Sequence, residues 1–389
     1  MPNLRKEAAV TIEKTASDID EQQTSQLRDL LLLSLVPGIG PKTFTSLLEN
    51  FSDAKRVLDC EQAQLRMVPG VGPKLAREIS LATKTIKVDR YLDLCEQNGI
   101  TILDLFNANY PVPLQEIHNP PPILFCKGQV KEEDSLAIAI VGSRHATYYG
   151  KRVAEQLARG LATAGYTIVS GLARGIDAAA HRGALAAGGR TIAVLGSGVL
   201  NVYPAEHVEL AKQVAEQGAV ISEVTPNRAP KGGAFPQRNR IVTGLSLGTI
   251  IVEAAQRSGA LISARLASEQ GREVFAVPGP IDSRMSKGCH QLIRDGAKLV
   301  ESVDDVLEEL GPLVKPTVTE DGETLHHPME LKLNDQERLI LNAIDQRPTE
   351  LDLIAERTDV PIARMLSTIS ALEIRRLIRR VSGNSVVRN

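Results

Sequence analysis

The sequence predicts an α/β protein built around a Rossmann-like, doubly wound and mostly parallel sheet. Between residues 136 and 300, short apolar segments alternate with amphipathic or alanine-rich stretches. Continuous apolar strands separated by helices are typical of a parallel sheet that is covered by helices on both faces. A repeated helical pattern precedes this region, and a second group of helical patterns follows it. We therefore expect a helical domain, the sheet domain and a small C-terminal domain, in that order.

The composition suits this class of fold. At 389 residues the chain is long enough for two or three domains, and with no Trp and 3% aromatic residues its core must be mainly aliphatic. The four cysteines are far apart and form no CxxC pair, which argues against structural zinc and a disulfide framework and suits a reducing cytoplasm. The chain shows no signal-peptide pattern and no apolar stretch of membrane-spanning length. We expect a soluble cytoplasmic protein with no metal and no cofactor.

Charge is unevenly distributed along the chain. The net charge is −2, but residues 136–300 hold 19 basic and 11 acidic side chains, a local charge of +8. The acidic excess lies mainly in residues 301–333, with 2 basic and 9 acidic side chains. Because charges act over roughly a Debye length, the basic central region is the relevant one for a polyanionic partner.

The N-terminal region contains an internal repeat. Residues 1–25 are polar, without periodicity, and predicted to be disordered. In residues 26–84, PGIGPK recurs 32 residues later as PGVGPK, each between helical patterns. The repeat resembles a tandem helix-hairpin-helix (SAM-like) domain, whose glycine turns expose backbone N–H groups to DNA phosphates. An equally weighted alternative is a packing or protein-contact module. The possible second DNA contact would comprise Gly38, Gly40, Lys42, Gly70, Gly72 and Lys74.

The remaining boundaries follow from proline and charge patterns. Residues 85–135 read as a connector packing on the core, with a short strand at GITILDL and then a proline-rich extended run. The Rossmann-like core is assigned to 136–311 and an acidic, proline-containing linker to 312–333. Residues 334–389 suggest three helices and a strand pair, which resembles a winged helix. Its arginines, Arg375, Arg376, Arg379 and Arg380, could face phosphates or simply be solvated.

Several glycine-rich or basic loops fall at the predicted carboxyl ends of the strands, where such sheets bind ligands. The strands are LAIAIVG, YTIVSG, RTIAVLG, AVISEV, GTIIVEA and EVFAVPG. The most informative loop is FPQRNR at 235–240: its arginines offer forked donors for phosphates and Phe235 a face for a base. The alternative is a buried helix whose arginines pair with nearby acids. For Arg144, in the GSRHA turn, the alternatives of a phosphodiester contact and a pair with Asp177 can coexist.

The sequence offers little support for catalysis. GSRHA lacks the third glycine of a dinucleotide fingerprint. Asp177 and His181 lie four residues apart on one predicted helix and invite pairing with a serine, Ser170 or Ser143, but no GxSxG elbow accompanies them, which favours a structural role. The remaining acids near strand ends, Glu223 and Glu253, form no metal-binding cluster. We expect no catalytic residues.

The central motifs resemble the DprA/Smf family, the bacterial DNA processing protein A of natural transformation. The matching runs cover roughly residues 110–305 and include VGSRHATYYGKRVAEQ, IVSGLARGIDAAAH, FPQRNRIVTGLS and GREVFAVPG. The resemblance implies a non-enzymatic protein that binds and protects single-stranded DNA and loads the RecA recombinase onto it in recombination. Carried over by position, the implied DNA-binding residues are Gly142, Ser143, Arg144, Gly171, Arg174, Gly175, Lys231, Phe235, Arg238, Asn239 and Arg240.

The resemblance also implies a homodimer joined through the end of the sheet domain. We assign His290, Leu292 and Leu299 to that interface. Two other functions remain open. One is a phosphoribohydrolase-like enzyme, for which GLSLGTIIVEA is a poor match to PGGxGTxxE because Glu253 is shifted by one residue. The other is a duplex- or branched-DNA adaptor that acts through the tandem hairpins.

Overall fold

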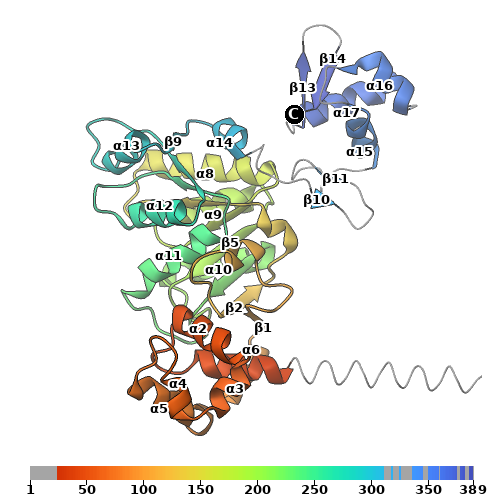
Figure 1. Ribbon diagram of the computed structural model, residues 1–389. Coiled ribbons are helices and arrows are strands. Elements are labelled where there is room, and N and C mark those ends of the chain that lie inside the picture. Colours follow the sequence, from red (N-terminus) through yellow and green to blue (C-terminus); the bar gives the residue numbers. More distant parts are fainter. Residues whose placement is uncertain are drawn as a thin grey trace, which may run out of the picture.

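A computed structural model describes residues 24–310, 317–318, 324–325, 335–344, 349–358, 360–374, 377–381 and 385–388 (Figure 1). Residues 1–23 of the predicted disordered N-terminus and most of the predicted linker lie outside these residues, whereas residues 24 and 25 begin a helix, which corrects the predicted boundary. Within the described ranges, no helix combines the length and apolar character that crossing a membrane would require.

The centre of the chain forms one nine-stranded sheet with the order β1-β2-β6-β5-β4-β3-β7-β8-β9. From β6 to β9 all neighbours are parallel, whereas β1 and β2 join that end of the sheet as antiparallel strands. The mostly parallel, Rossmann-like sheet predicted from the sequence is therefore confirmed, with its predicted strands all present. The strands are β1 (Ile100–Asp104), β2 (Ile123–Gly128), β3 (Ala137–Val141), β4 (Thr167–Ser170), β5 (Thr191–Leu195), β6 (Ala219–Ser222), β7 (Gly248–Ile251), β8 (Glu273–Ala276) and β9 (Lys298–Leu299).

Helices cover both faces of this sheet, as continuous apolar strands require. Ile138 and Ile140 of β3 pack with α8, α9 and α14 on one face, whereas Ala139 and Val141 pack with α11, α12 and α13 on the other. The helices are α7 (Val112–Gln115), α8 (Tyr148–Thr163), α9 (Ile176–Ala186), α10 (Val208–Gln217), α11 (Ala234–Gly244), α12 (Gly259–Glu269), α13 (Lys287–Arg294) and α14 (Val303–Leu310), with 3-10 turns η1 (Glu132–Ser135) and η2 (Ala205–His207).

The segment 85–135 is more regular than its prolines suggested. It contains α6 (Val88–Gln97) and both antiparallel strands, of which the sequence indicated only β1. Pro120–Pro122 precede β2 and do not interrupt it, so the ILFCKG run forms ladder bonds to β1 and β6.

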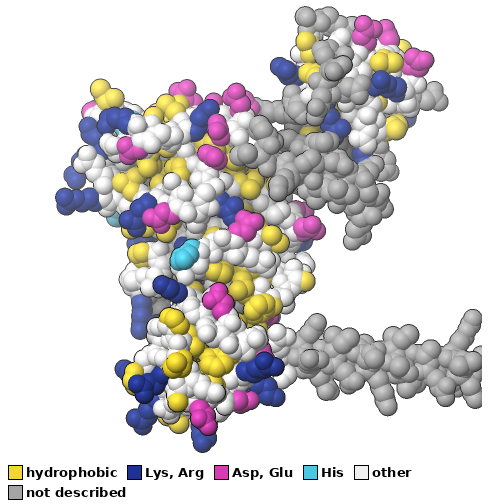
Figure 2. Space-filling model, viewed as in Figure 1, with side chains coloured by type: hydrophobic (Ala, Val, Ile, Leu, Met, Phe, Trp, Pro, Cys, Tyr) yellow, Lys and Arg dark blue, Asp and Glu magenta, His cyan; other side chains and the backbone are white. Residues whose placement is uncertain are grey.

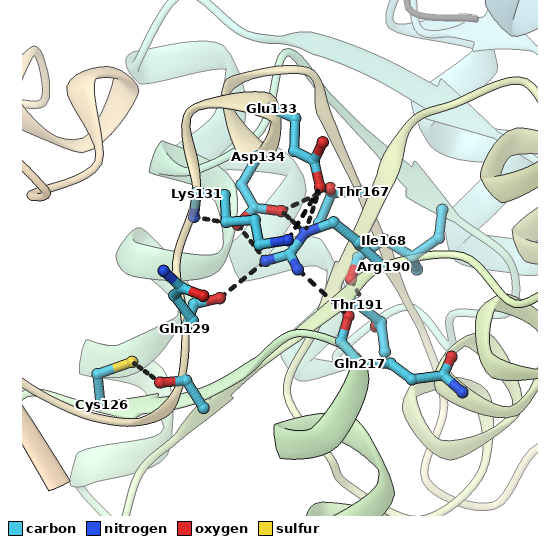
Figure 3. Close-up of polar contacts among 11 residues, drawn as sticks. Cys126, Gln129, Lys131, Glu133, Asp134, Thr167, Ile168, Arg190, Thr191 and Gln217 are labelled. Atoms are coloured by element: carbon cyan, nitrogen blue, oxygen red, sulfur yellow. Dashed lines mark hydrogen bonds and ion pairs between the residues drawn. The ribbon is translucent and has the colours of Figure 1, made fainter. Parts of the chain in front are cut away.

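An ion-pair cluster fixes this segment to the amino ends of the central strands (Figure 3). Arg190, which precedes β5, pairs with the buried Asp134 of η1 at 2.7 Å and also donates to the main-chain carbonyl of Gln129. Asp134 accepts in addition from the Thr167 hydroxyl at 2.7 Å. Because a buried carboxylate needs several donors, this cluster determines where η1 sits beneath β4 and β5.

The helical module shows the predicted tandem hairpins. Its helices are residues 24–34, α2 (Pro41–Phe51), α3 (Ala54–Asp59), α4 (Gln62–Leu65) and α5 (Pro73–Thr85). Gly38 and Gly70 have φ of 95° and 88°, the left-handed region that favours glycine, and each repeat then starts a helix with proline. Its apolar core continues into that of the sheet through α6, β1 and β2.

The C-terminal module contains α15 (Asp335–Asn342), α16 (Leu351–Thr358) and α17 (Ile362–Ile374). Its sheet has three strands, one more than the pair the sequence suggested, in the order β12 (Thr349–Glu350), β14 (Ser385–Arg388), β13 (Ile378–Val381). Arg379 and Arg380 are exposed on β13, and Arg380 pairs with Glu373 at 3.1 Å. Arg375 and Arg376 lie outside the described residues. Before this module, β10 (Thr317–Val318) and β11 (Thr324–Leu325) pair antiparallel.

Candidate nucleic-acid interface

A cleft of about 580 Å³ opens at the carboxyl edge of the sheet. Strand β3 lies between β4 and β7, so the chain order reverses there, and this switch point is where open α/β sheets bind ligands. The loops after all three strands contribute to the cleft, together with the first turns of α11 and α12. Its lining includes Gly142, Ser143, Arg144, Gly171, Phe235, Arg238 and Asn239 from the predicted set.

Close backbone approach explains two glycines, Gly142 in the cleft lining and Gly175 just outside it. A Cβ on Gly142 would lie 2.6 Å from a side-chain carbon of Ile176, the first residue of α9. Gly175 has φ of 81°, and a Cβ there would lie 2.2 Å from the carbonyl oxygen of Ser143. The loops after β3 and β4 therefore pack directly against each other and form a narrow, rigid wall.

The exposed cations of the cleft point to an anionic ligand. The guanidinium carbon of Arg144 lies 5.2 Å from the ring centroid of Phe235, a cation–π contact that holds the cation over the face of the ring. Arg257 also lines the cleft, whereas Lys231, exposed just before α11, lies outside its lining. In the described part of the chain none of these three cations forms an ion pair, although Arg144 is close enough to the buried Asp177 to interact with it electrostatically.

Arg238 forms the buried floor of the cleft. It is 6% exposed and donates through Nη1 to the main-chain carbonyl of Val194, while its Nε has no partner. Burial lowers its pKa to about 10, against the opposing effect of Asp177. Arg238 therefore supports the floor, and only part of its surface faces the cleft.

Arg240 and Arg174 are engaged by acids in this structure. Arg240 pairs with Glu223 and donates to the carbonyl of Asn119 at 2.8 Å, behind the cleft. Arg174 pairs with Glu206 at 2.6 Å on the surface next to the cleft. The alternative of a helix whose arginines pair with nearby acids thus describes Arg240, which lies in α11 and outside the cleft lining.

The potential Ser–His–Asp arrangement is not formed. The His181 Nδ1 contacts the Thr191 hydroxyl at 2.7 Å, and the Ser170 hydroxyl donates to the carbonyl of Ile140. Burial lowers the pKa of His181 to about 3 and raises the pKa of the buried Asp177, which accepts from the N–H of Ala173 at 3.3 Å. Asp177 therefore stabilises the loop before α9, in agreement with the structural role that the sequence favoured.

Glu253 is the acid considered for the phosphoribohydrolase alternative. Its carboxylate binds Thr147, the residue that caps the start of α8. Its two oxygens accept from the backbone N–H and the hydroxyl of Thr147, at 2.9 and 2.6 Å. Thr147 itself caps α8 through Gly150. The carboxylate is 4% exposed and does not line the cleft. Among the described residues, no group of three or more His, Cys, Asp or Glu side chains could hold a metal ion.

Sequence reasoning missed part of this surface. Arg257 and Met285 line the cleft, and the ring of Tyr203 lies 5.6 Å from that of Phe235. Arg257 directly precedes Ser258, which also lines the cleft, in the serine–glycine loop after the GTIIVEA strand, so its position could have been inferred from the sequence. Tyr203 follows β5 by eight residues, and nothing in the sequence pattern placed it beside Phe235.

The predicted dimer residues are in different environments. His290 contacts the carbonyl of Gly279 at 3.0 Å, and Leu292 packs against the core of its own chain. Leu299 is 40% exposed on β9, the edge strand of the sheet. Figure 2 shows Lys and Arg side chains at the left edge of the sheet domain, around α12 and α13, and on the helical module below it.

Comparison with known proteins identifies the relatives of this chain. Residues 101–311, more than half of the chain, match the family model of DNA recombination-mediator protein A. The chain belongs to the DprA/Smf family. Residues 326–384 match the DprA winged helix domain, and residues 29–85 match the SAM-like helix-hairpin-helix tandem.

Individual DprA/Smf relatives agree with this assignment. Protein Smf of Escherichia coli (strain K12) is 42% identical over 294 residues, which cover 75% of this chain and 78% of that protein. DNA processing protein DprA of Streptococcus pneumoniae is 46% identical over 200 residues, which cover 51% of this chain and 71% of that protein. The X-ray structure of S. pneumoniae DprA matches with a TM-score of 0.65 at 36% identity, covering 73% of this chain and 97% of that chain.

Proposed function

We propose that this DprA/Smf protein binds single-stranded DNA in the cleft at the carboxyl edge of its sheet. The observation that carries the proposal is the contact of Arg144 with Phe235 in a cleft whose exposed arginines, Arg144 and Arg257, form no ion pair among the described residues. A cation beside an aromatic face suits a backbone phosphate next to an unstacked base. In a duplex the base faces are stacked away from such a surface, so single strands are the favoured ligand.

The recombination role extends this proposal. A protein of the DNA recombination-mediator family that binds incoming strands in natural transformation would protect them and load the RecA recombinase onto them. Binding through phosphates and one stacked base tolerates any sequence, as a mediator of recombination requires. The matching DNA-processing relatives support the general role, and RecA loading is the finer part of the proposal.

For the predicted residues in and beside the cleft we propose distinct roles. Arg144 and Lys231 bind phosphates, Phe235 stacks on a base, and Arg238 holds the floor in place. Asn239 and Ser143 offer polar contacts to the strand. The glycines Gly142, Gly171 and Gly175 allow the loops to approach each other. The hairpin turns of the helical module, with exposed Lys42 and Lys74, provide the proposed second DNA contact.

The test is a salt-dependent binding titration of the full chain on oligothymidine and on duplex DNA. Arg144→Ala should weaken single-strand binding and reduce the slope of log K against log salt by about 0.7, the loss of one single-strand phosphate contact. The matched control is Arg159→Ala, an exposed arginine in α8 that pairs with Glu155 and does not line the cleft. An unchanged slope and affinity in Arg144→Ala would reject the cleft as the binding site.

The same titration addresses the adaptor alternative. If the tandem hairpins carry DNA binding, Lys42→Ala with Lys74→Ala should abolish duplex binding while Arg144→Ala has no effect. We expect the opposite ranking for single strands. Hydrolysis of a nucleoside monophosphate to free base by the purified protein would instead favour the enzymatic alternative.

A further inference from the structure

A second aromatic and a second arginine lie on the surface directly beside the cleft. Tyr203 is 42% exposed, and its ring is tilted by 48° to that of Phe235, which lines the cleft. Arg174 follows Ala173, another lining residue, and is itself exposed. Neither Tyr203 nor Arg174 lines the cleft. A strand that leaves the cleft over Phe235 therefore meets these two side chains next.

The donors of Arg174 are occupied by an acid. Its Nε donates to Oε1 of Glu206 at 2.7 Å and its Nη2 to Oε2 at 2.6 Å, a two-point pair at the start of η2. The two hydrogen bonds raise the pKa of Arg174 and lower the pKa of Glu206. Arginine binds a phosphate with the same two-point geometry. Glu206 thus takes the place that a phosphate would take.

We propose that Tyr203 and Arg174 form a second nucleotide subsite for single-stranded DNA, and that Glu206 limits its occupancy by competing with phosphate for Arg174. This inference rests on the proposed function of the cleft and goes beyond it, because it assigns an affinity-lowering role to one acid. Tyr203 offers a face for the base that follows the one on Phe235. Arg174 binds the phosphate of that nucleotide once Glu206 is displaced.

The Arg174–Glu206 ion pair is exposed enough for a DNA phosphate to compete with the carboxylate. More than half of each side chain is in contact with solvent, and exposed ion pairs contribute little stability because water and salt screen them. A phosphate can therefore displace the carboxylate. The displaced Glu206 stays next to a polyanion, however, and its charge continues to oppose binding at this end of the groove.

The experiment uses Glu206→Gln in the full chain, with oligothymidines from dinucleotide to dodecanucleotide. Glutamine keeps the shape of the side chain and removes its charge. We expect no change for the shortest strands and, beyond a threshold length, binding about twofold to fivefold tighter at low salt. The salt slope should rise by about 0.7 beyond that same length, because one more phosphate is neutralised.

Glu216→Gln is the matched control. Glu216 is an exposed acid of α10 that forms no ion pair with any described residue, so its replacement changes the net charge equally without releasing Arg174. Arg174→Ala should have little effect in the parent protein and should cancel the gain in the Glu206→Gln background. Tyr203→Leu should reduce that gain as well. Such coupling would show that the three side chains act at one subsite.

Four results would overturn the inference. An equal gain at every strand length, shared by Glu216→Gln, would mean a long-range charge effect. No gain would mean that the strand does not pass Arg174, and weaker binding would mean that Glu206 positions Arg174 for the ligand. A parent protein that binds no single strand would reject the proposed function and the inference with it, whereas each of the other results leaves the cleft intact.

Discussion

The side chain of Arg238 lies directly against the α-carbon of Gly171, where a Cβ atom would come within 1.8 Å of Nη1. Gly171 follows β4 and Arg238 lies in α11, so this contact joins the loop after β4 to helix α11 at the floor of the cleft. Only glycine permits the approach. Because Nη1 also donates to the carbonyl of Val194 at the end of β5, the guanidinium has little space in which to move.

Gly171→Ala should therefore damage the cleft more than a single methyl group suggests. The added carbon must displace a buried, hydrogen-bonded guanidinium, and overpacking of this kind costs about 1–3 kcal/mol. We expect a lower free energy of unfolding and at least tenfold weaker single-strand binding, measured by urea denaturation and by oligonucleotide titration. Gly232→Ala is the control: Gly232 lines the same cleft, and a Cβ there meets nothing within 4 Å. Equal behaviour of the two variants would contradict this account of the floor.

The sequence was sufficient to predict the framework and insufficient to predict its contacts. Apolar runs such as LAIAIVG predicted the parallel strands because their period and length leave few other structures. The ILFCKG strand was missed since it follows three prolines and one of its two neighbours, β6, is far away in sequence. Sequence also grouped Arg238 with Arg240, although their separation by two residues on α11 turns one side chain to the cleft floor and the other to Glu223. Such differences depend on packing between distant segments.

Glu253→Gln tests whether this acid serves the fold. Its oxygens accept from the N–H and the hydroxyl of Thr147, and a glutamine amide would place a donor against one of these donors. We expect the free energy of unfolding to fall by about 1–2 kcal/mol, as for the loss of a helix cap. Oligonucleotide affinity per folded molecule should stay unchanged, because Glu253 does not line the cleft. An unaltered stability combined with loss of a hydrolytic activity would favour the enzymatic alternative.

Leu299→Arg tests the proposed homodimer. Leu299 is 40% exposed on the edge strand β9, so a charge there should be tolerated by the folded monomer. If two copies of the parent protein pair across this edge, light scattering should show that the Leu299→Arg variant is a monomer. The variant should also lose more affinity for long oligonucleotides than for short ones, because its two grooves are no longer linked. The exposed Lys298→Ala serves as a neighbouring control. A variant with unchanged mass and unchanged binding to long strands would exclude this edge as the interface.

His181 makes the stability of the sheet domain dependent on pH. The Thr191 hydroxyl donates its hydrogen to the carbonyl of Ile168. It therefore accepts a hydrogen bond from the N–H at Nδ1 of His181, and the unprotonated Nε2 is buried without a partner. A proton on Nε2 would create an unpaired buried cation near Arg238. Burial, reinforced by that positive charge, accordingly lowers the pKa of His181 to about 3.

The sign of the effect follows from proton binding. The unfolded chain takes up a proton on this imidazole near its ordinary pKa of about 6.5, whereas the folded chain does so only near pH 3. Between these values the unfolded state binds more protons, so stability is lost as the pH falls. At pH 5 this group alone should cost about 2 kcal/mol relative to pH 7.5, which corresponds to about 1.4 kcal/mol per pH unit below the unfolded pKa.

The measurement compares the parent with His181→Asn by urea unfolding at pH 7.5 and pH 5, followed by circular dichroism. The variant should be less stable than the parent at pH 7.5, since it loses buried volume. Between pH 7.5 and pH 5, however, its free energy of unfolding should fall by about 2 kcal/mol less than that of the parent. His145→Asn, at an exposed position of the cleft, controls for the loss of an imidazole elsewhere. An identical fall in all three proteins would mean that His181 is protonated in the folded state at pH 5, and that the pocket beside Thr191 is open to water.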